Sequence, residues 1–224
     1  TVDGKKDTDV SRTDHFLTPD ISLGYFFNET SMINLSYRMA TIKPPYSQLT
    51  SGLTYAGEHE IEGGNPMLRD EKMHNLQLFG QWNDFMLQVD YIRSLDTYAF
   101  VKEIYPASSL QMLLHPVNVN VSELSTYLIW SRPIRRWIPE VTLGLSKPWM
   151  KLGNDSYDKP IFSYSVQNSI TLPKGFYISA NVRGQSSGDM HTNRFAASWF
   201  VMDMSVRKTF FDKALAIKLT ATDI

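Results

Sequence analysis

The residues that could perform catalysis or bind a metal are few in this chain, and their spacing favours neither. The five histidines lack the H-x-H or H-x-x-x-H spacing that brings two imidazoles to one metal ion. They are His15, His59, His74, His115 and His191. Cysteine is absent, which excludes disulfides and cysteine-based zinc sites. We therefore expect no bound metal, no cofactor and no enzymatic activity.

The segment Ser186–Asp189 brings hydroxyl and carboxylate groups together, as a nucleophilic site would require. Its residues are turn formers, whose side chains commonly hydrogen-bond their own backbone in solvated turns. The chain also lacks the G-x-S-x-G nucleophile elbow, the Walker loop and the G-x-G-x-x-G fingerprint. We interpret Ser186–Asp189 as a solvated turn rather than as a nucleophile.

Aromatic, amide and cationic side chains in the polar segments are better suited to binding a ligand than to catalysis. Aromatic faces beside hydrogen-bonding groups suit sugars, peptides or siderophores equally. The candidate ligand-binding residues are Tyr46, Tyr55, Asn65, Arg69, Trp149, Tyr157, His191 and Arg194. For Trp149 and Tyr157 the alternative is that they anchor a membrane interface, where amphipathic aromatic rings are enriched.

Segments that alternate between apolar and polar residues must position these side chains. In Phe85–Val101, Leu87 and Val89 alternate with Gln88 and Asp90, the period-two pattern of a strand with one apolar face. The other expected strands are Phe16–Phe27, Ile33–Met39, Met73–Trp82, Asn118–Trp130, Ile138–Lys151, Pro160–Leu172, Phe176–Ser186, Arg194–Phe210 and Leu215–Thr220. Most are longer than globular strands and suit the roughly 9–11 residues that a tilted strand needs to cross a bilayer.

The connections between these strands alternate between short and long along the whole chain. The short ones are Asn28–Thr30, Asn83–Asp84, Ser131–Trp137, Pro173–Gly175 and Phe211–Lys213. The long ones are Lys43–Glu71, Tyr105–Val117, Leu152–Lys159 and Ser186–Arg194. Short turns at one rim and long loops at the other are typical of outer-membrane barrels, whereas a soluble sandwich has no reason to sort its connections. The pattern predicts an all-β, antiparallel transmembrane β-barrel meander of about ten strands.

The composition agrees with a membrane barrel and excludes other classes of protein. The formal net charge is −1, so the chain has no basic excess for binding nucleic acid. Its 12% aromatic content is too high for a disordered tail. No window approaches the run of about 18 apolar residues of a spanning helix, but barrel strands need only alternating hydrophobicity. We expect outer-membrane lipid, and not nucleic acid, as a partner.

Two segments carry a resemblance to a known family. Between the second and third strands the chain reads SYRMATIKPPYSQLTSGLTYAGEHEIEGGNPMLRDEKMHNLQL, and it ends in LAIKLTATDI. Both resemble TonB-dependent outer-membrane transporters, most of all the Bacteroidetes outer-membrane barrel family related to the SusC-type importers. The matching positions are Lys43, Pro44, Tyr46, Leu49, Gly64, Asn65, Pro66, Leu68 and Glu71. Arg69 and Asp70 stand where that family more often has Lys-Pro.

The resemblance implies an architecture in which this chain is part of a larger wall. It covers residues 15–224 and implies an arc of a barrel of about 22 strands, with residues 1–14 as a polar leader or loop remnant. The long loops would lie outside the cell, and the last strand and a plug domain would be absent from the chain. The implied location is the outer membrane of a Gram-negative bacterium.

The resemblance also implies a function, namely part of a TonB-dependent receptor that imports a glycan, peptide or siderophore-type nutrient into the periplasm. The TonB complex would act through the absent plug region, and a surface lipoprotein is a candidate partner. Two alternatives stay open: a non-transporting outer-membrane barrel for adhesion or assembly, and a soluble β-sandwich binding module. A plug domain of roughly 100–150 residues encoded before Thr1 would favour import over adhesion.

The GGNP segment has two interpretations. In the structural one, Gly63 and Gly64 can adopt positive φ, Pro66 pushes Asn65 towards extended geometry, and Leu68 packs as the chain enters the next strand. In the functional one, Asn65 or Arg69 contacts a ligand. Under the first interpretation the structural motif comprises Gly63, Gly64, Asn65, Pro66, Leu68 and Glu71.

The alternating strands generate a first prediction about solubility. The natural protein should be folded and monodisperse only in detergent or lipid, because the apolar side chains of the strands have no protein layer to cover them. Size-exclusion chromatography with circular dichroism, in buffer with and without detergent, checks this. A monodisperse β-protein in plain buffer would support the soluble sandwich instead.

Overall fold

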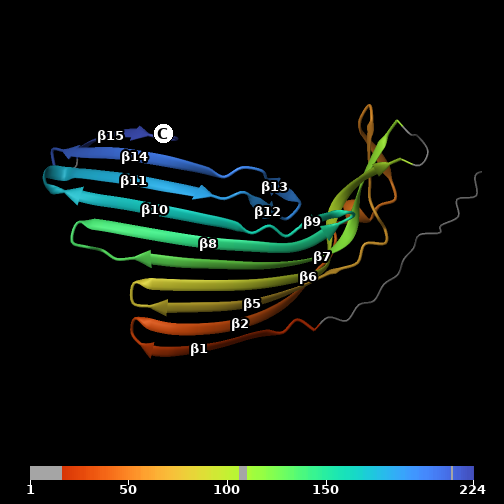
Figure 1. Cartoon of the computed structure of the whole chain (residues 1–224), viewed down its shortest axis with the longest axis horizontal. Helices are drawn as coiled ribbons and strands as arrows, with labels where there is room; N and C mark the ends of the chain where they lie inside the picture. The colour runs from red at the N-terminus through yellow and green to blue at the C-terminus, as the bar shows by residue number, and fades with distance from the viewer. Residues whose placement is uncertain (1–16, 106–109, 213) are drawn as a thin grey trace, which may run out of the picture.

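The computed structural model describes residues 17–105, 110–212 and 214–224, which form one antiparallel meander (Figure 1). Its main path runs through β1 (Asp20–Asn28), β2 (Ser31–Ile42), β5 (Glu71–Trp82), β6 (Phe85–Ile104), β7 (Met112–Ser131), β8 (Trp137–Leu152), β10 (Ile161–Leu172), β11 (Phe176–Gln185), β14 (Trp199–Phe210) and β15 (Leu215–Ala221). The connections contain α1 (Tyr46–Leu49), β3 (Leu53–Gly57), β4 (Glu60–Gly63), β9 (Asp155–Tyr157), η1 (Pro173–Gly175), β12 (Gly188–Met190) and β13 (Asn193–Phe195).

The expected meander is confirmed. Each strand of the main path pairs antiparallel with the next, and all the short turns lie at one end of the sheet, on the left of Figure 1. The long connections lie at the opposite end, where they form further small strands. Within the described residues no helix is long and apolar enough to cross a membrane.

Several strand limits differ from the sequence prediction because local pairing decides them. β7 begins at Met112 instead of Asn118, since its first residues pair with both β6 and β4. β14 begins at Trp199 instead of Arg194, because Asn193–Phe195 pair with β12 in a separate hairpin. β9 folds back on β8 inside the loop expected at Leu152–Lys159. The leader expected at residues 1–14 lies outside the described residues, as does Phe16.

The register keeps residues of one kind on one face across the sheet. Cross-strand pairing from β1 to β10 places one row of residues side by side: Leu23, Leu35, Leu78, Val89, Thr126, Leu145 and Phe162. The neighbouring row on the other face includes Ser36, Gln77, Asp90, Ser125 and Ser146. Successive side chains of a strand point to opposite faces. The sheet therefore has an apolar face, which contains the first row, and a polar face, which contains the second.

No described part of the chain covers the apolar face. Leu23 is 72% exposed and Leu219 is 73% exposed, although both are strand residues. Only six buried hydrophobic residues are found in the described part of the chain. A continuous exposed apolar surface of this kind marks a membrane contact. The second sheet that a sandwich would need is absent from the described residues, whose only other sheet is the small β12–β13 pair.

The packed core lies beyond the wall, at the end with the long connections. There β6 and β7 extend past a bulge between Ser94 and Thr97, and Ala99, Val119 and Met150 pack together. Val117, Val121, Leu152 and Tyr157 surround them. β4 pairs in parallel with the start of β7 and joins the long β2–β5 connection to this extension. The extension gives the long connections a fixed base.

The two faces generate a second prediction, a matched pair of arginine substitutions. Leu143 lies on the apolar face and Thr142 on the polar face, in the middle of β8. Leu143→Arg should lower the unfolding free energy by about 2–4 kcal/mol, because it places a charge among lipid tails. Thr142→Arg should cost less than about 1 kcal/mol, since its side chain stays in water. Reversible unfolding of the natural full-length protein in phospholipid vesicles measures both, and equal costs would contradict the assignment of the faces.

Candidate functional site

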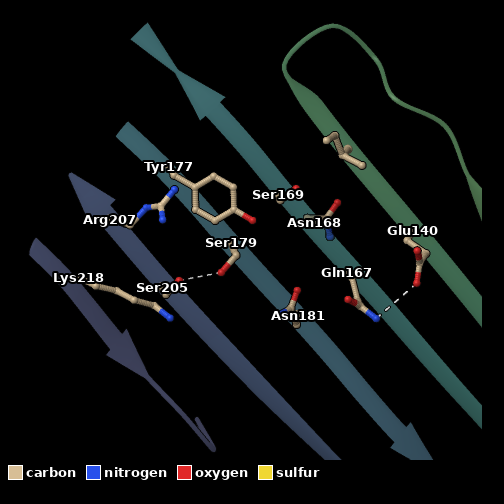
Figure 2. A pocket seen from close by; sticks show the side chains of 11 residues that line it. Glu140, Gln167, Asn168, Ser169, Tyr177, Ser179, Asn181, Ser205, Arg207 and Lys218 are labelled. Carbon is tan, nitrogen blue, oxygen red and sulfur yellow. Dashed lines mark hydrogen bonds between the residues drawn. The ribbon is translucent and has the colours of Figure 1, made fainter. Parts of the chain in front are cut away.

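The polar face is hollowed over its last five strands. A concavity of about 530 Å³ lies there, which we call the polar concavity (Figure 2). It is lined by Ile138, Glu140, Gln167, Asn168, Ser169, Tyr177, Ser179, Asn181, Ser205, Arg207 and Lys218. Most of these residues come from consecutive rows of β8, β10, β11, β14 and β15. The regular alternation of the strands aims these side chains into the same space, except that of Asn168, whose Oδ1 accepts from Trp137 Nε1 at 3.1 Å on the other face.

A few hydrogen bonds and charged side chains line the polar concavity. The hydroxyl oxygens of Ser179 and Ser205 are 2.8 Å apart. Gln167 Nε2 donates to Glu140 Oε1 at 3.5 Å. The Arg207 guanidinium lies 5.2 Å from the centre of the Tyr177 ring, a cation–π distance. The arrangement offers amide, hydroxyl and guanidinium groups to a polar ligand, and it contains no hydrogen-bonded nucleophile and base of the catalytic kind.

The same chemistry continues along the polar face of the earlier strands. Asp90 accepts hydrogen bonds from Gln77 at 2.8 Å and from Gln88 at 2.7 Å. Glu123 accepts from the hydroxyls of Ser125 and Ser146, each at 3.0 Å. Buried or half-buried carboxylates need such partners, because an unpaired charge is costly to desolvate. The polar face is thus a surface suited to water or to another polar protein surface.

The GGNP segment is held by the backbone of its neighbours, and Leu68 is buried as expected. A Cβ atom on Gly64 would lie 2.3 Å from the carbonyl oxygen of Thr50, and one on Gly63 would lie 2.9 Å from Leu53. Neither Gly63 nor Gly64 has positive φ, so neither uses the conformation that glycine permits. Gly64 is required because the backbone of Gln48 and Thr50 passes too close for a side chain. A Cβ atom on Gly63, in contrast, would meet only the side chains of Leu53 and Leu113.

Asn65 and Arg69 both make contacts that secure the loop. Asn65 donates from Nδ2 to the carbonyl oxygen of Pro116 at 3.0 Å, and its Oδ1 accepts from the Met67 amide at 2.9 Å. The Arg69 guanidinium lies 2.6 Å from Asp96, the residue with φ 60° in the β6 bulge. The Arg69 side chain is still more than half exposed. These contacts explain both residues structurally, while Arg69 keeps donors that face solvent.

Tyr157 and Arg194 are the two predicted ligand residues that the fold brings into contact. The Arg194 guanidinium lies 4.8 Å from the centre of the Tyr157 ring. It donates to the carbonyl oxygen of Ser156 at 2.7 Å and lies 3.4 Å from Asp155 Oδ1. This contact fastens the β12–β13 hairpin onto the β8–β9 hairpin. Both side chains are engaged in holding two outer connections together.

Asp189 is the anchor of this junction, and here the sequence interpretation was wrong. Asp189 is 2% exposed, not part of a solvated turn. Its Oδ2 accepts hydrogen bonds from the amides of Asp158 and Lys159, both at 3.0 Å, and Arg194 Nε lies 3.7 Å from its Oδ1. A short sequence cannot reveal this, because both amides come from a connection about 30 residues away.

The other predicted ligand residues are separately placed. Tyr46 opens α1 and is 91% exposed, and Tyr55 lies on β3 and is also exposed. His191 occupies the β12–β13 turn with φ 53°. Trp149 points from the apolar face of β8, where Lys147 Nζ lies 5.1 Å from its ring centre. Its position is that of an interface aromatic rather than a side chain directed at the polar face.

The residues of the polar concavity were not predicted as a site. The alternation of the strands indicates that Arg183, Asp203, Arg207 and Lys218 share the polar face. It does not indicate where that face is hollow, because a concavity depends on how side chains of five strands fill the space between them. Among the described residues no group of three or more His, Asp or Glu side chains is arranged to hold a metal ion.

The fold and the two faces define a membrane-spanning wall of β-strands with lipid on one side and a polar interior on the other. The comparison with family models agrees. Residues 2–224 match the model of the outer membrane protein beta-barrel family, so the chain belongs to that family and to the outer membrane. No curated protein matches the chain.

The junction at Asp189 generates a third prediction. Asp189→Ala should remove the charged acceptor of the part-buried amides of Asp158 and Lys159, at a cost of about 1–3 kcal/mol. Hydrogen exchange at these two amides should then be roughly 10- to 100-fold faster. The control is Asp155→Ala, which removes an exposed carboxylate from the same junction and should change exchange little. Equal effects of the two variants would mean that Asp189 does not anchor the hairpins.

Proposed function

We propose that this chain forms part of the barrel of a TonB-dependent outer-membrane receptor that imports a nutrient into the periplasm. The observation that carries the proposal is the polar face, which is hydrogen-bonded from β1 to β15 and lies open to the interior side, with most of its side chains half-buried among their neighbours. In a barrel of eight to ten strands, interior side chains meet and fill the lumen. A hydrogen-bonded polar face that no other described layer covers supports a wide lumen that holds water or a polar plug.

The open edges support a large barrel for a second reason. In the described residues β1 and β15 stand at opposite ends of the strand order and do not pair with each other. An unpaired strand edge in hydrocarbon leaves amide and carbonyl groups without partners, at several kcal/mol each. We propose that further strands complete the wall, in a barrel of about 22 strands as a whole.

The outer connections would supply the first contacts with the ligand. Tyr46 and Tyr55 are exposed on the β2–β5 connection, and Arg69 keeps part of its guanidinium in solvent. Aromatic faces beside such donors suit a glycan, a peptide or a siderophore-type ligand. A surface lipoprotein that covers this rim is a further partner under the same proposal. A non-transporting barrel for adhesion or assembly is the alternative, and the outer connections alone are equally compatible with it.

Binding to TonB is the fourth prediction and separates the two candidates. The natural full-length protein, purified in detergent, should bind the isolated C-terminal domain of TonB, because an importer must couple its plug to the energy complex. Isothermal titration calorimetry measures the complex. The control is the same protein with the whole segment that precedes this chain removed, which should not bind.

The outcomes of this experiment are distinct. Binding that is lost with the preceding segment supports import. Absence of binding by a full-length protein that is folded and heat-modifiable on gels would favour the adhesion or assembly barrel. Binding that persists after the segment is removed would also contradict the proposal, because coupling would then not involve a plug.

A further inference from the structure

Charged residues are divided unequally between the two faces of the wall. Six carboxylates of the main-path strands lie on the polar face: Asp20, Glu71, Asp90, Glu123, Glu140 and Asp203. The other two are Asp96, in the bulge beside Arg69, and Glu103, in the extension beside His115. The apolar face of these ten strands therefore carries no carboxylate in the part of the chain that the structure describes. It does carry cations.

Apart from Lys208, which lies near the short turns, the cations on the apolar side of the wall strands gather at the rim with the long connections. His74 of β5 pairs with Arg93 of β6, Arg93 pairs with Ser122 of β7, and Ser122 pairs with Trp149 of β8. The alternation along each strand places all four residues on the apolar face. Lys72 lies one step further out on β5, and Lys147 and Lys151 flank Trp149 on β8. We call the group Lys72, His74, Arg93, Lys147, Trp149 and Lys151 the cationic rim.

The height of the cationic rim matches the edge of the lipid tails. His74 lies eight residues above Trp82, and Lys151 lies fourteen above Trp137, where both tryptophans mark the short-turn end. At about 3.3 Å per residue and a strand tilt near 40°, these separations correspond to heights of roughly 20–35 Å. The apolar band of an outer-membrane barrel is about 25 Å tall. The rim thus lies where tails give way to headgroups.

Within residues 17–105, 110–212 and 214–224, no carboxylate neutralises the charges of the rim. Lys72, Arg93 and Lys151 make no ion pair among the described residues. Lys147 donates to the backbone oxygen of Asp158 at 2.6 Å and lies over Trp149. The Tyr37 hydroxyl lies 2.8 Å from His74 Nδ1, which holds that ring in place. Free cations at the level of lipid headgroups are complementary to anionic headgroups.

We propose that the cationic rim is a binding site for the phosphate groups of a phosphorylated glycolipid in the outer leaflet. The long connections of outer-membrane barrels face the outside, so the rim meets the outer leaflet. Arg93 can bind a phosphate through two parallel N–H donors, and the lysines act as point charges. Trp149 packs beside the acyl chains at the interface. The site is independent of import, since it rests on the lipid-facing surface alone.

The fifth prediction tests this site by removing its charges. The natural full-length protein in detergent should bind diphosphoryl lipid A, measured by native mass spectrometry in the presence of EDTA so that divalent ions cannot bridge. The triple variant Lys72→Gln, Arg93→Gln, Lys151→Gln should bind on the order of a hundred-fold more weakly, because each cation near an anionic surface contributes roughly fivefold. Dephosphorylated lipid A should bind the original protein equally weakly.

Matched controls separate binding from folding. Arg135→Gln, Arg136→Gln, Lys174→Gln removes the same charge from the short-turn rim and should keep the affinity. Lys72→Arg, Arg93→Lys, Lys151→Arg keeps the charge and should retain most of the binding. Equal losses in the two glutamine triples, or equal binding of lipid A with and without phosphate, would overturn the proposal. Equal binding of phosphatidylglycerol would overturn it too, because the rim would then not select the outer-leaflet glycolipid.

Discussion

Inside a bilayer there is no water to hydrogen-bond the backbone, and the rest of this structure depends on that constraint. The chain meets it with an antiparallel ladder in which every strand of the main path pairs with the next. Antiparallel neighbours can be joined by tight turns, which explains the short connections at one end (Figure 1). The ladder also forces the period-two alternation, because successive side chains must face lipid and interior in turn.

The two faces solve opposite problems. On the apolar face, large side chains remain exposed in the chain alone, and cations are confined to the headgroup levels. On the polar face, carboxylates are each held by neighbours, as Asp90 is by Gln77 and Gln88. Lys208 is a cation of the apolar face that lies at the opposite rim. Its ammonium group lies over Phe176 and Phe210 near the short turns. The position of a charge therefore depends on its depth in the membrane as well as on the face of the sheet that carries it.

The long connections obey different physics, because they leave the bilayer and can fold by packing. Gly64 is required by the backbone oxygen of Thr50, and Asp189 is required by two amides of another connection. Both interactions join segments that are distant in sequence. A pattern in a single segment predicts how that segment alternates, but not which other segment it will contact. For this reason the strands were predicted well and the loop contacts were not.

The sequence by itself determined the meander, its ten main strands, the sorting of turns and loops, and the membrane location, because each follows from local alternation and turn chemistry. Only the tertiary structure decided the junction at Asp189, the hollow on the polar face and the cationic rim. These features depend on register, which places His74 beside Arg93 and Ser179 beside Ser205. Register is a relation between strands, and a shift of one residue would move every one of these side chains to the other face.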